Sequence, residues 1–276
     1  MTVPTLTLNN RTEIPQLGFG VFQVPPAQTA DVVTQALQVG YRHIDTAQMY
    51  GNEQEVGAAL AAAGLPRDEL WITSKLNNGF HRPDDARREF DASLARLGLE
   101  QIDLFLVHWP LPTLYDGDYV STWQTLIEFV QDGRARSIGV SNFQPAHLDR
   151  IVAETGVVPA VNQIEVHPYF ANNAAREASH RHGALVESWS PIAQGAVLDD
   201  EVIGKIAAAH GRTPSQVTLR WHVERGDIVF PKTTHRDRME ENFAIFDFEL
   251  SADDVAAIDA LDRGESGRRG PNPDTF

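Results

Sequence analysis

The chain has 276 residues, of which 42% are hydrophobic and 22% are charged, a composition typical of a globular protein with a large core. It contains no cysteine, which excludes disulfide bonds and thiolate metal sites. The formal net charge of −15 disfavours a general nucleic-acid binder and a protein that binds anionic membranes, so any bound anion requires a local basic site.

The first predicted element is a β-hairpin at residues 5–17, TLTLNNRTEIPQL, which turns at Asn9 and Asn10. We expect this hairpin to cover the bottom of the fold that follows it. The first ten residues lack the basic and apolar segments of an export signal, and no apolar run of about 18 residues occurs anywhere. A cytoplasmic protein is therefore expected.

The rest of the chain alternates β-type runs, rich in Val and Ile, with amphipathic segments. Hydrophobic and polar residues alternate little within these runs, which indicates parallel strands that are buried on both faces. Repeated strand–helix units predict a (β/α)8 TIM barrel, as a single domain over residues 1–276, with a Gly/Pro-rich and mobile tail from residue 263. The eight predicted strands are residues 18–22, 43–47, 70–76, 103–109, 137–143, 160–167, 184–190 and 227–232.

The functional residues of such a barrel lie where the strands end and the loops begin. Asp45, Lys75 and His108 end the second, third and fourth predicted strands, which are neighbours around a barrel. A buried carboxylate requires a cation, and Lys75 is positioned to supply it. Tyr50 lies in the loop that follows Asp45. The other polar side chains at strand ends are Ser141, Asn142, Gln163, Glu165, His167, Trp189 and Lys232.

These groups suit the reduction of a carbonyl. A phenol has a pKa near 10, and a nearby ammonium group is expected to lower it and to stabilise the phenolate. Tyr50 then gives a proton to the carbonyl oxygen while a hydride adds to the carbon, and His108 hydrogen-bonds the same oxygen. Each residue alone is more often structural, but their placement on three adjacent strands favours the catalytic interpretation.

The sequence indicates an anion site beyond the last predicted strand. No G-x-G-x-x-G motif occurs, so a Rossmann dinucleotide site is not supported. Lys232, Thr233, Thr234 and Arg238 instead supply cations, hydroxyl groups and helix N–H groups at one helix start.

Six stretches lie in order along nearly the whole chain: residues 40–57, 73–76, 103–110, 137–143, 161–170 and 230–242. Together they closely resemble the aldo-keto reductases. This resemblance implies an NADPH-dependent oxidoreductase that acts on CH–OH donors, with Tyr50 as the general acid of a tetrad with Asp45, Lys75 and His108. The short loops, the hairpin and Trp189 resemble the bacterial 2,5-diketo-D-gluconate reductases, which implies small keto sugars, keto acids or dicarbonyls such as methylglyoxal as substrates.

The resemblance also implies a set of residues that bind NADPH or NADP+. Lys232, Thr233, Thr234 and Arg238 correspond to the pocket for the adenosine 2′-phosphate. The other implied residues hold the nicotinamide carboxamide (Ser141, Asn142 and Gln163), stack on its ring (Trp189), line the pyrophosphate loop (Ser190, Pro191, Ile192, Gln194 and Gly195) and reach the adenine (Glu241 and Asn242).

The chain departs from the family pattern at two positions. Many relatives carry a tryptophan shortly after the catalytic lysine, where this chain has Leu76, Asn77 and Asn78. The substrate pocket is therefore expected to be roomier or more polar, with Phe22, Met49, Asn77 and Trp109 around it. Phe230 replaces the usual aliphatic residue before Pro231, a change expected to affect packing only.

Two other function classes are compatible with parts of the sequence. A metal-dependent barrel hydrolase would use His108, Glu165 and His167, although no His-x-His motif ends the first strand. A nucleotide-sensing regulatory subunit would bind the cofactor without useful turnover. The reductase interpretation predicts that no metal is bound, and the lack of an obvious apolar surface helix predicts a monomer.

Overall fold

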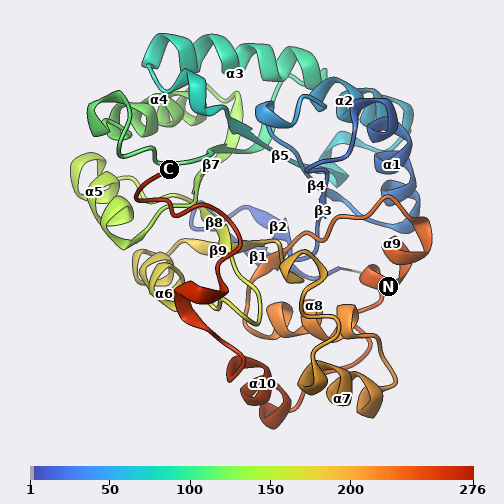
Figure 1. The fold of residues 1–276 in the computed structure, drawn as a ribbon. Helices are drawn as coiled ribbons and strands as arrows, with labels where there is room; N and C mark the ends of the chain where they lie inside the picture. Colours follow the sequence, from blue (N-terminus) through green and yellow to red (C-terminus); the bar gives the residue numbers. More distant parts are fainter. Residues whose placement is uncertain (1–2) are drawn as a thin grey trace.

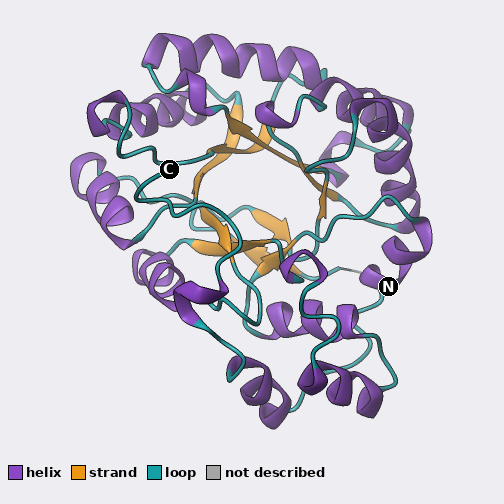
Figure 2. Ribbon diagram, viewed as in Figure 1, coloured by secondary structure: helices purple, strands orange, loops and turns teal. Residues whose placement is uncertain are grey.

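The computed structural model describes residues 3–276, which form an eight-stranded parallel barrel with helices around it (Figures 1 and 2). All eight predicted strands are present. Seven are shorter than their predicted ranges, and the fifth, Ala135–Ser141, has the predicted length but begins two residues earlier. The strands follow one another in chain order around the sheet: β3 (Phe19–Gly20), β4 (His43–Asp45), β5 (Trp71–Leu76), β6 (Ile102–Val107), β7 (Ala135–Ser141), β8 (Val161–Glu165), β9 (Leu185–Trp189) and β10 (Ile228–Val229).

The barrel closes between its first and last strands. Leu17, just before β3, forms a parallel bridge with Val229 of β10. The Gly18 N–H donates a hydrogen bond to the Val229 carbonyl at 2.8 Å, and the Val229 N–H donates to the Gln16 carbonyl at 3.0 Å. These bonds give the end strands of the sheet partners on both sides.

The helices form a ring outside the strands (Figure 2). Helix α1 buries Val32, Val33, Ala36 and Leu37 on one face, as its sequence spacing predicts. Within residues 3–276, no helix is both long and apolar enough to cross a membrane. The helices are α1 (Pro26–Val39), α2 (Glu53–Ala62), α3 (Pro83–Leu97), α4 (Val120–Gln131), α5 (Pro145–Thr155), α6 (Asn173–His182), α7 (Glu201–His210), α8 (Pro214–Glu224), α9 (Arg236–Phe243) and α10 (Ala252–Asp259).

The predicted hairpin is present and covers the barrel bottom. Strands β1 (Thr5–Thr7) and β2 (Glu13–Pro15) pair antiparallel. The Asn9 amide donates to the carbonyls of Val158 and Pro159, and the Asn10 amide donates to the Arg136 carbonyl. Both asparagines of the turn thus hold the hairpin to the amino-terminal side of β7 and β8.

The opposite end of the barrel, where the strands finish, is here called the mouth. After α10, the chain turns back and residues 263–276 run across the mouth towards α4 (Figure 1). The tail that was predicted to be mobile therefore has a defined place, and its contacts are described with the site below.

Candidate active site

Lys75 lies at the centre of the polar cluster in the mouth. Its Nζ donates hydrogen bonds to Asp45 Oδ1 at 2.7 Å, to the Thr46 carbonyl at 2.9 Å and to the Tyr50 hydroxyl oxygen at 3.3 Å. The Lys75 side chain is fully buried and that of Asp45 is 3% exposed. Strands β4 and β5 are hydrogen-bonded neighbours, which brings the two side chains together as the sequence predicts.

The loop that carries Tyr50 is fixed from two sides. Tyr50 is the last residue of a short 3₁₀ helix, η1 (Gln48–Tyr50). Beyond it, the Asn52 side chain accepts a hydrogen bond from Thr46 Oγ1 at 2.8 Å and donates one to the Val21 carbonyl at 3.1 Å. The Gln48 side chain accepts from the Asn77 N–H at 2.7 Å and donates to α3.

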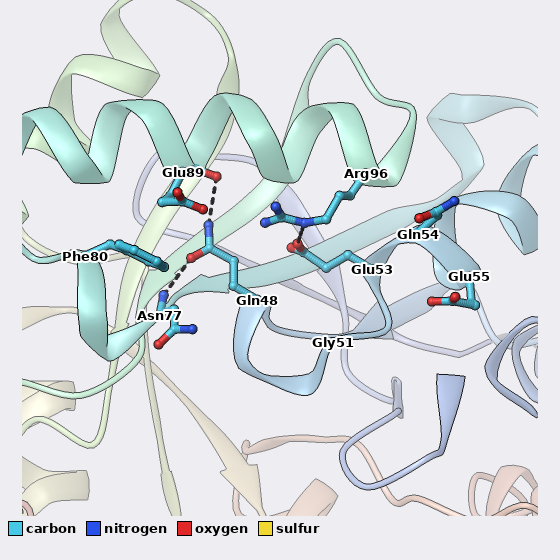
Figure 3. Close-up of a pocket in the computed structure, with 9 residues that line it drawn as sticks. All are labelled: Gln48, Gly51, Glu53, Gln54, Glu55, Asn77, Phe80, Glu89 and Arg96. Carbon is cyan, nitrogen blue, oxygen red and sulfur yellow. Dashed lines mark hydrogen bonds and ion pairs between the residues drawn. The ribbon is translucent and has the colours of Figure 1, made fainter. Parts of the chain in front are cut away.

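A pocket of about 310 Å³ lies behind this loop, between η1, α2 and α3 (Figure 3). Gln48 spans one side of it, and the ion pair of Glu53 with Arg96 at 2.7 Å closes the other. Asn77, which was predicted to line the substrate pocket, lines this pocket. Its place in a substrate site stays a prediction.

His108 stands beside the tyrosine. The two rings meet edge to face with their centroids 5.8 Å apart. Burial, together with the positive charge of Lys75, holds the pKa of His108 well below its usual value. The imidazole is therefore neutral at physiological pH, with one ring N–H available as a hydrogen-bond donor.

The protonation states of the other groups follow from burial and from their mutual contacts. Burial raises the pKa of Tyr50 above its usual value, and the Lys75 charge opposes this rise without cancelling it. The expectation of a lowered phenol pKa is therefore wrong, because desolvation of the phenolate outweighs its attraction to the ammonium group. Burial alone would lower the pKa of Lys75, but Asp45 and Tyr50 raise it, so the lysine stays charged.

The predicted carboxamide-binding residues form one hydrogen-bonded group on β7, just after it, and on β8, and this group contacts Trp189 of β9. Ser141 Oγ donates to the Gln163 carbonyl at 2.8 Å. Asn142 has a left-handed backbone with φ 65°, and its side chain donates to the His108 carbonyl and accepts from Trp189 Nε1 at 2.9 Å. These contacts connect the group to the catalytic candidates.

The loop after β9 has a strained backbone. Ser190, Ala193 and Gln194 have positive φ angles of 51°, 49° and 56° although none is glycine, and Gly195 follows with 94°. Such conformations persist where the surrounding structure imposes them, and they are frequent at ligand sites. The loop contains the positions predicted to line the pyrophosphate: Ser190, Pro191, Ile192, Gln194 and Gly195.

The predicted anion site lies at the start of α9. Lys232 and Arg238 are exposed, and neither makes a salt bridge within residues 3–276. Neighbouring Arg236, in contrast, pairs with Glu240 at 2.9 Å. The remaining predicted residues lie in the same region: Thr233, which accepts a bond from the His235 N–H; exposed Thr234; Glu241, which accepts from Thr213; and Asn242, which accepts from Ser215.

Apolar side chains lie around the polar cluster in the mouth, at what is here called the entrance to the candidate active site. Phe22 and Met49 are about half exposed, and the Phe22 ring lies 5.0 Å from that of Tyr50. Trp109 is 8% exposed because Phe276 of the tail packs against it with ring centroids 4.4 Å apart. Sequence reasoning missed Phe276, since nothing in the tail sequence indicates where the tail packs.

Glu165 holds the tail in place. Its carboxylate accepts hydrogen bonds from the Arg269 N–H at 2.6 Å, from the Gly270 N–H at 2.9 Å and from His167 Nε2 at 3.0 Å. The carboxylate of the proposed hydrolase site is thus engaged by the tail. Within residues 3–276, no group of three or more His, Cys, Asp or Glu side chains is arranged to hold a metal ion.

Comparison with known proteins gives consistent matches along the whole chain. Residues 16–263 match the sequence model described as the Aldo/keto reductase family. An aldo-keto reductase of Mycolicibacterium smegmatis is 47% identical over 273 residues, 99% of this chain and 98% of that protein. The methylglyoxal reductase DkgA of Yersinia pestis is 45% identical over 276 residues, 99% of this chain and 97% of that protein. A Gox0644 variant crystallised in complex with NADPH is 44% identical with a TM-score of 0.95, and the match covers 100% of this chain and 99% of that one.

Proposed function

The chain belongs to the aldo/keto reductase family, and from this premise we propose that it reduces small aldehydes and ketones to alcohols with NADPH. The observation that carries the proposal is the position of Lys75, whose ammonium group contacts both Asp45 and Tyr50 next to His108. A cation held by a carboxylate beside a phenol is the arrangement that proton donation to a new alkoxide requires.

Tyr50 is the proton donor in this proposal. Its raised pKa keeps the phenol protonated until the carbonyl oxygen gains negative charge. The proton then moves from the Tyr50 hydroxyl to that oxygen, and Lys75 stabilises the phenolate that remains. Neutral His108 donates a hydrogen bond to the same oxygen and orients the carbonyl. General acid catalysis of this kind contributes roughly 10²- to 10⁴-fold to the rate.

The residues present fit a nicotinamide dinucleotide phosphate. Lys232 and Arg238 are exposed cations without salt-bridge partners among the described residues, on a chain with a net charge of −15. They would pair with the adenosine 2′-phosphate. Ser141, Asn142 and Gln163 would hold the carboxamide, and Trp189 would stack on the ring. When bound, NADPH supplies the hydride.

Apolar side chains at the entrance to the site and the name of a similar protein support the proposed substrate class. Phe22, Met49 and Trp109 offer apolar walls, and Phe276 narrows the space against Trp109. Small keto acids, keto sugars and dicarbonyls are the proposed substrates because the similar Yersinia pestis protein is named a methylglyoxal reductase.

The test is to follow the loss of NADPH absorbance with a panel that includes methylglyoxal, 2,5-diketo-D-gluconate, other keto acids, aldoses and aromatic aldehydes. Chelator-treated protein should turn over the small dicarbonyls or keto acids many times per active site. Tight NADPH binding without turnover on any carbonyl would favour a regulatory role. Activity that chelation abolishes and added metal restores would favour a metal-dependent enzyme.

A further inference from the structure

Glu187 carries a buried carboxyl group next to the polar cluster in the mouth. The proposed reaction does not use this carboxyl group. It lies in β9, paired in register with Gln163 of β8 and Ile228 of β10, and its side chain is fully buried. Its Oε2 accepts a hydrogen bond from Gln163 Nε2 at 2.9 Å. Among residues 3–276, no group hydrogen-bonds its Oε1.

Gln163 connects this carboxyl group to the candidate active site. Its Nε2 also donates to Asp45 Oδ2 at 2.9 Å, and the other oxygen of Asp45 accepts from Lys75. Both N–H groups of the Gln163 amide are therefore directed at carboxyl oxygens, and the ionised carboxylate of Asp45 can only accept a hydrogen bond. The amide orientation is thereby fixed, and only the side-chain carbonyl oxygen of Gln163 remains to accept a bond from a ligand.

The charges around Glu187 favour its neutral form. Asp45 and Lys75 are the charged groups that act on it from inside the barrel. The next residue, Ser188, points to the opposite face of β9, where it contacts the Asp227 carboxylate. Asp227 is itself paired there with Arg176 and hydrogen-bonded to His222. Burial first, and then the charge of Asp45, raise the pKa of Glu187 to about 8.

We propose that Glu187 is a positioning residue which, as an uncharged carboxyl group, holds the Gln163 amide in the orientation that presents its carbonyl oxygen to the nicotinamide carboxamide. The inference rests on the proposed function and concerns a residue that acts through Gln163. Ionisation of Glu187 places a second negative charge near Lys75. The ammonium group then stabilises the Tyr50 phenolate less well, so the phenol becomes a weaker acid and reduction slows.

The test compares Glu187→Gln, Glu187→Met and, as a matched control, Ser188→Ala on the outer face of the same strand. Glutamine keeps an acceptor for Gln163 and cannot ionise, so activity at pH 7 should stay within about 2-fold of the parent. Methionine has similar bulk but no such acceptor. Loss of one hydrogen bond of ordinary strength should weaken NADPH binding, measured by fluorescence quenching, by about 5- to 10-fold, with a similar fall in kcat.

The pH profile separates positioning from mere packing. In the parent protein, kcat should fall about 10-fold between pH 7 and pH 9 as Glu187 ionises. Glu187→Gln should lack this fall, and Ser188→Ala should keep it. A parent-like fall in Glu187→Gln, or parent-like NADPH affinity in Glu187→Met, would overturn the proposal.

The proposal and the proposed function fail in different ways. A parent protein that binds NADPH but reduces no carbonyl contradicts the function, while the affinities of the three variants still report on Gln163. If Glu187→Met does not fold, the proposal still requires two results from Glu187→Gln. Its NADPH affinity at pH 7 must equal that of the parent, and its kcat must not fall between pH 7 and pH 9. An active parent with unaffected variants contradicts only the role of Glu187.

Discussion

Lys75 is a charged residue in the barrel interior, where an unpaired ammonium group would not be tolerated. Asp45, the Thr46 carbonyl and the Tyr50 oxygen all accept hydrogen bonds from it. The same contacts that compensate for its burial also deliver its charge to the phenol. Stability and the proposed catalysis should therefore both depend on this side chain.

Replacing Lys75 with Met should affect both properties. Asp45 would be left as a buried and unpaired carboxylate, so the free energy of unfolding should fall by roughly 3 to 5 kcal/mol. Activity should be lost, because the phenolate has no cation. Urea titration gives the first quantity and NADPH oxidation the second. The double variant Lys75→Met with Asp45→Leu should recover much of the stability but none of the activity. If the double variant is as unstable as Lys75→Met alone, the unpaired Asp45 charge is not the cause of the lost stability.

Replacing Tyr50 with Phe removes the proposed proton donor and leaves the cofactor residues in place. Carbonyl reduction should fall at least about 100-fold while the NADPH dissociation constant stays nearly unchanged. Tyr169→Phe is the matched control, since the buried Tyr169 donates its hydroxyl hydrogen to Asp200, which is not among the proposed catalytic or cofactor residues. Parent-like turnover in Tyr50→Phe would remove this residue from the mechanism.

At the residue scale, sequence reasoning found the groups at strand ends and missed those placed by packing. Asp45, Lys75 and His108 were predictable because parallel strands deliver their last residues to one end of a barrel. Glu187 was not predicted because it lies two positions before the end of its strand, and its proposed role rests on the register with Gln163. The raised pKa of Tyr50 depends on burial, which no spacing of residues reports.

Helix α9 is the element on which the choice of cofactor should depend. The 2′-phosphate of NADPH carries nearly two negative charges. Lys232 and Arg238 are the exposed cations near the helix start that make no salt bridge within residues 3–276. Replacing them with Gly and His should raise the Michaelis constant for NADPH strongly, since each charge-assisted contact contributes about 1.5 to 3 kcal/mol. NADH use should change little or improve.

The matched control for this change is Arg236→His on the same helix. Arg236 already pairs with Glu240 and bonds to Gln38, so it is less available to a phosphate. Steady-state kinetics with both cofactors should show no change of preference in this control. Equal losses with NADPH and NADH in the double variant would mean that α9 does not recognise the 2′-phosphate.

The only regular structure in the tail is a short 3₁₀ helix, η6 (Gly264–Gly267), and Glu165 is the tail's main polar anchor. Glu165→Gln removes the charge that holds two backbone N–H groups and should free residues 269–276 from the mouth. Hydrogen exchange at the Arg269 and Gly270 amides should then accelerate at least about 10-fold, since hydrogen bonds to charged groups contribute about 1.5 to 3 kcal/mol. Glu13→Gln in the hairpin is the control that should leave this exchange unchanged; unaltered exchange in Glu165→Gln would show that other contacts hold the tail.

Strand existence was easier to predict than strand length. Residues 227–232 were predicted as one strand, but β10 contains only Ile228 and Val229. Pro231 has no N–H to donate to a sheet, which limits regular pairing beyond that point. The tail could not be placed from sequence, because its contacts come from Glu165 and Trp109, which are remote in the chain.

For the whole molecule, buried titratable groups connect stability with pH. Glu187 has a pKa near 4.5 when unfolded and about 8 when folded. The folded state therefore retains a proton that the unfolded chain has lost, so stability is full below pH 4.5 and falls as the pH rises towards 8. His43 acts in the opposite direction. Burial lowers its pKa to about 3, and its contribution is lost as the pH falls from 6.5.

Glu187→Gln should therefore have little effect on stability at pH 5 and a larger effect at higher pH. The parent loses stability as Glu187 ionises and the variant does not. The free energy of unfolding of the variant, relative to that of the parent, should thus rise by a few kcal/mol between pH 5 and pH 8, at about 1.4 kcal/mol for each unit by which the pKa is shifted in the parent. Urea titrations at a series of pH values measure this difference. A constant difference across the range would mean that Glu187 does not titrate there.

The closure of the barrel has a consequence for how the chain reaches its native state. The Gln16 side chain donates to the Asp227 carbonyl across 211 positions of sequence, next to the bridge of Leu17 with Val229. During synthesis, β3 must wait with an unpaired edge until β10 has left the ribosome. Contacts so distant in sequence slow folding, and an open strand edge invites association with other chains. Nascent chains that end before Val229 should thus be the aggregation-prone species on this pathway, and chaperone demand should drop once the last strand is released.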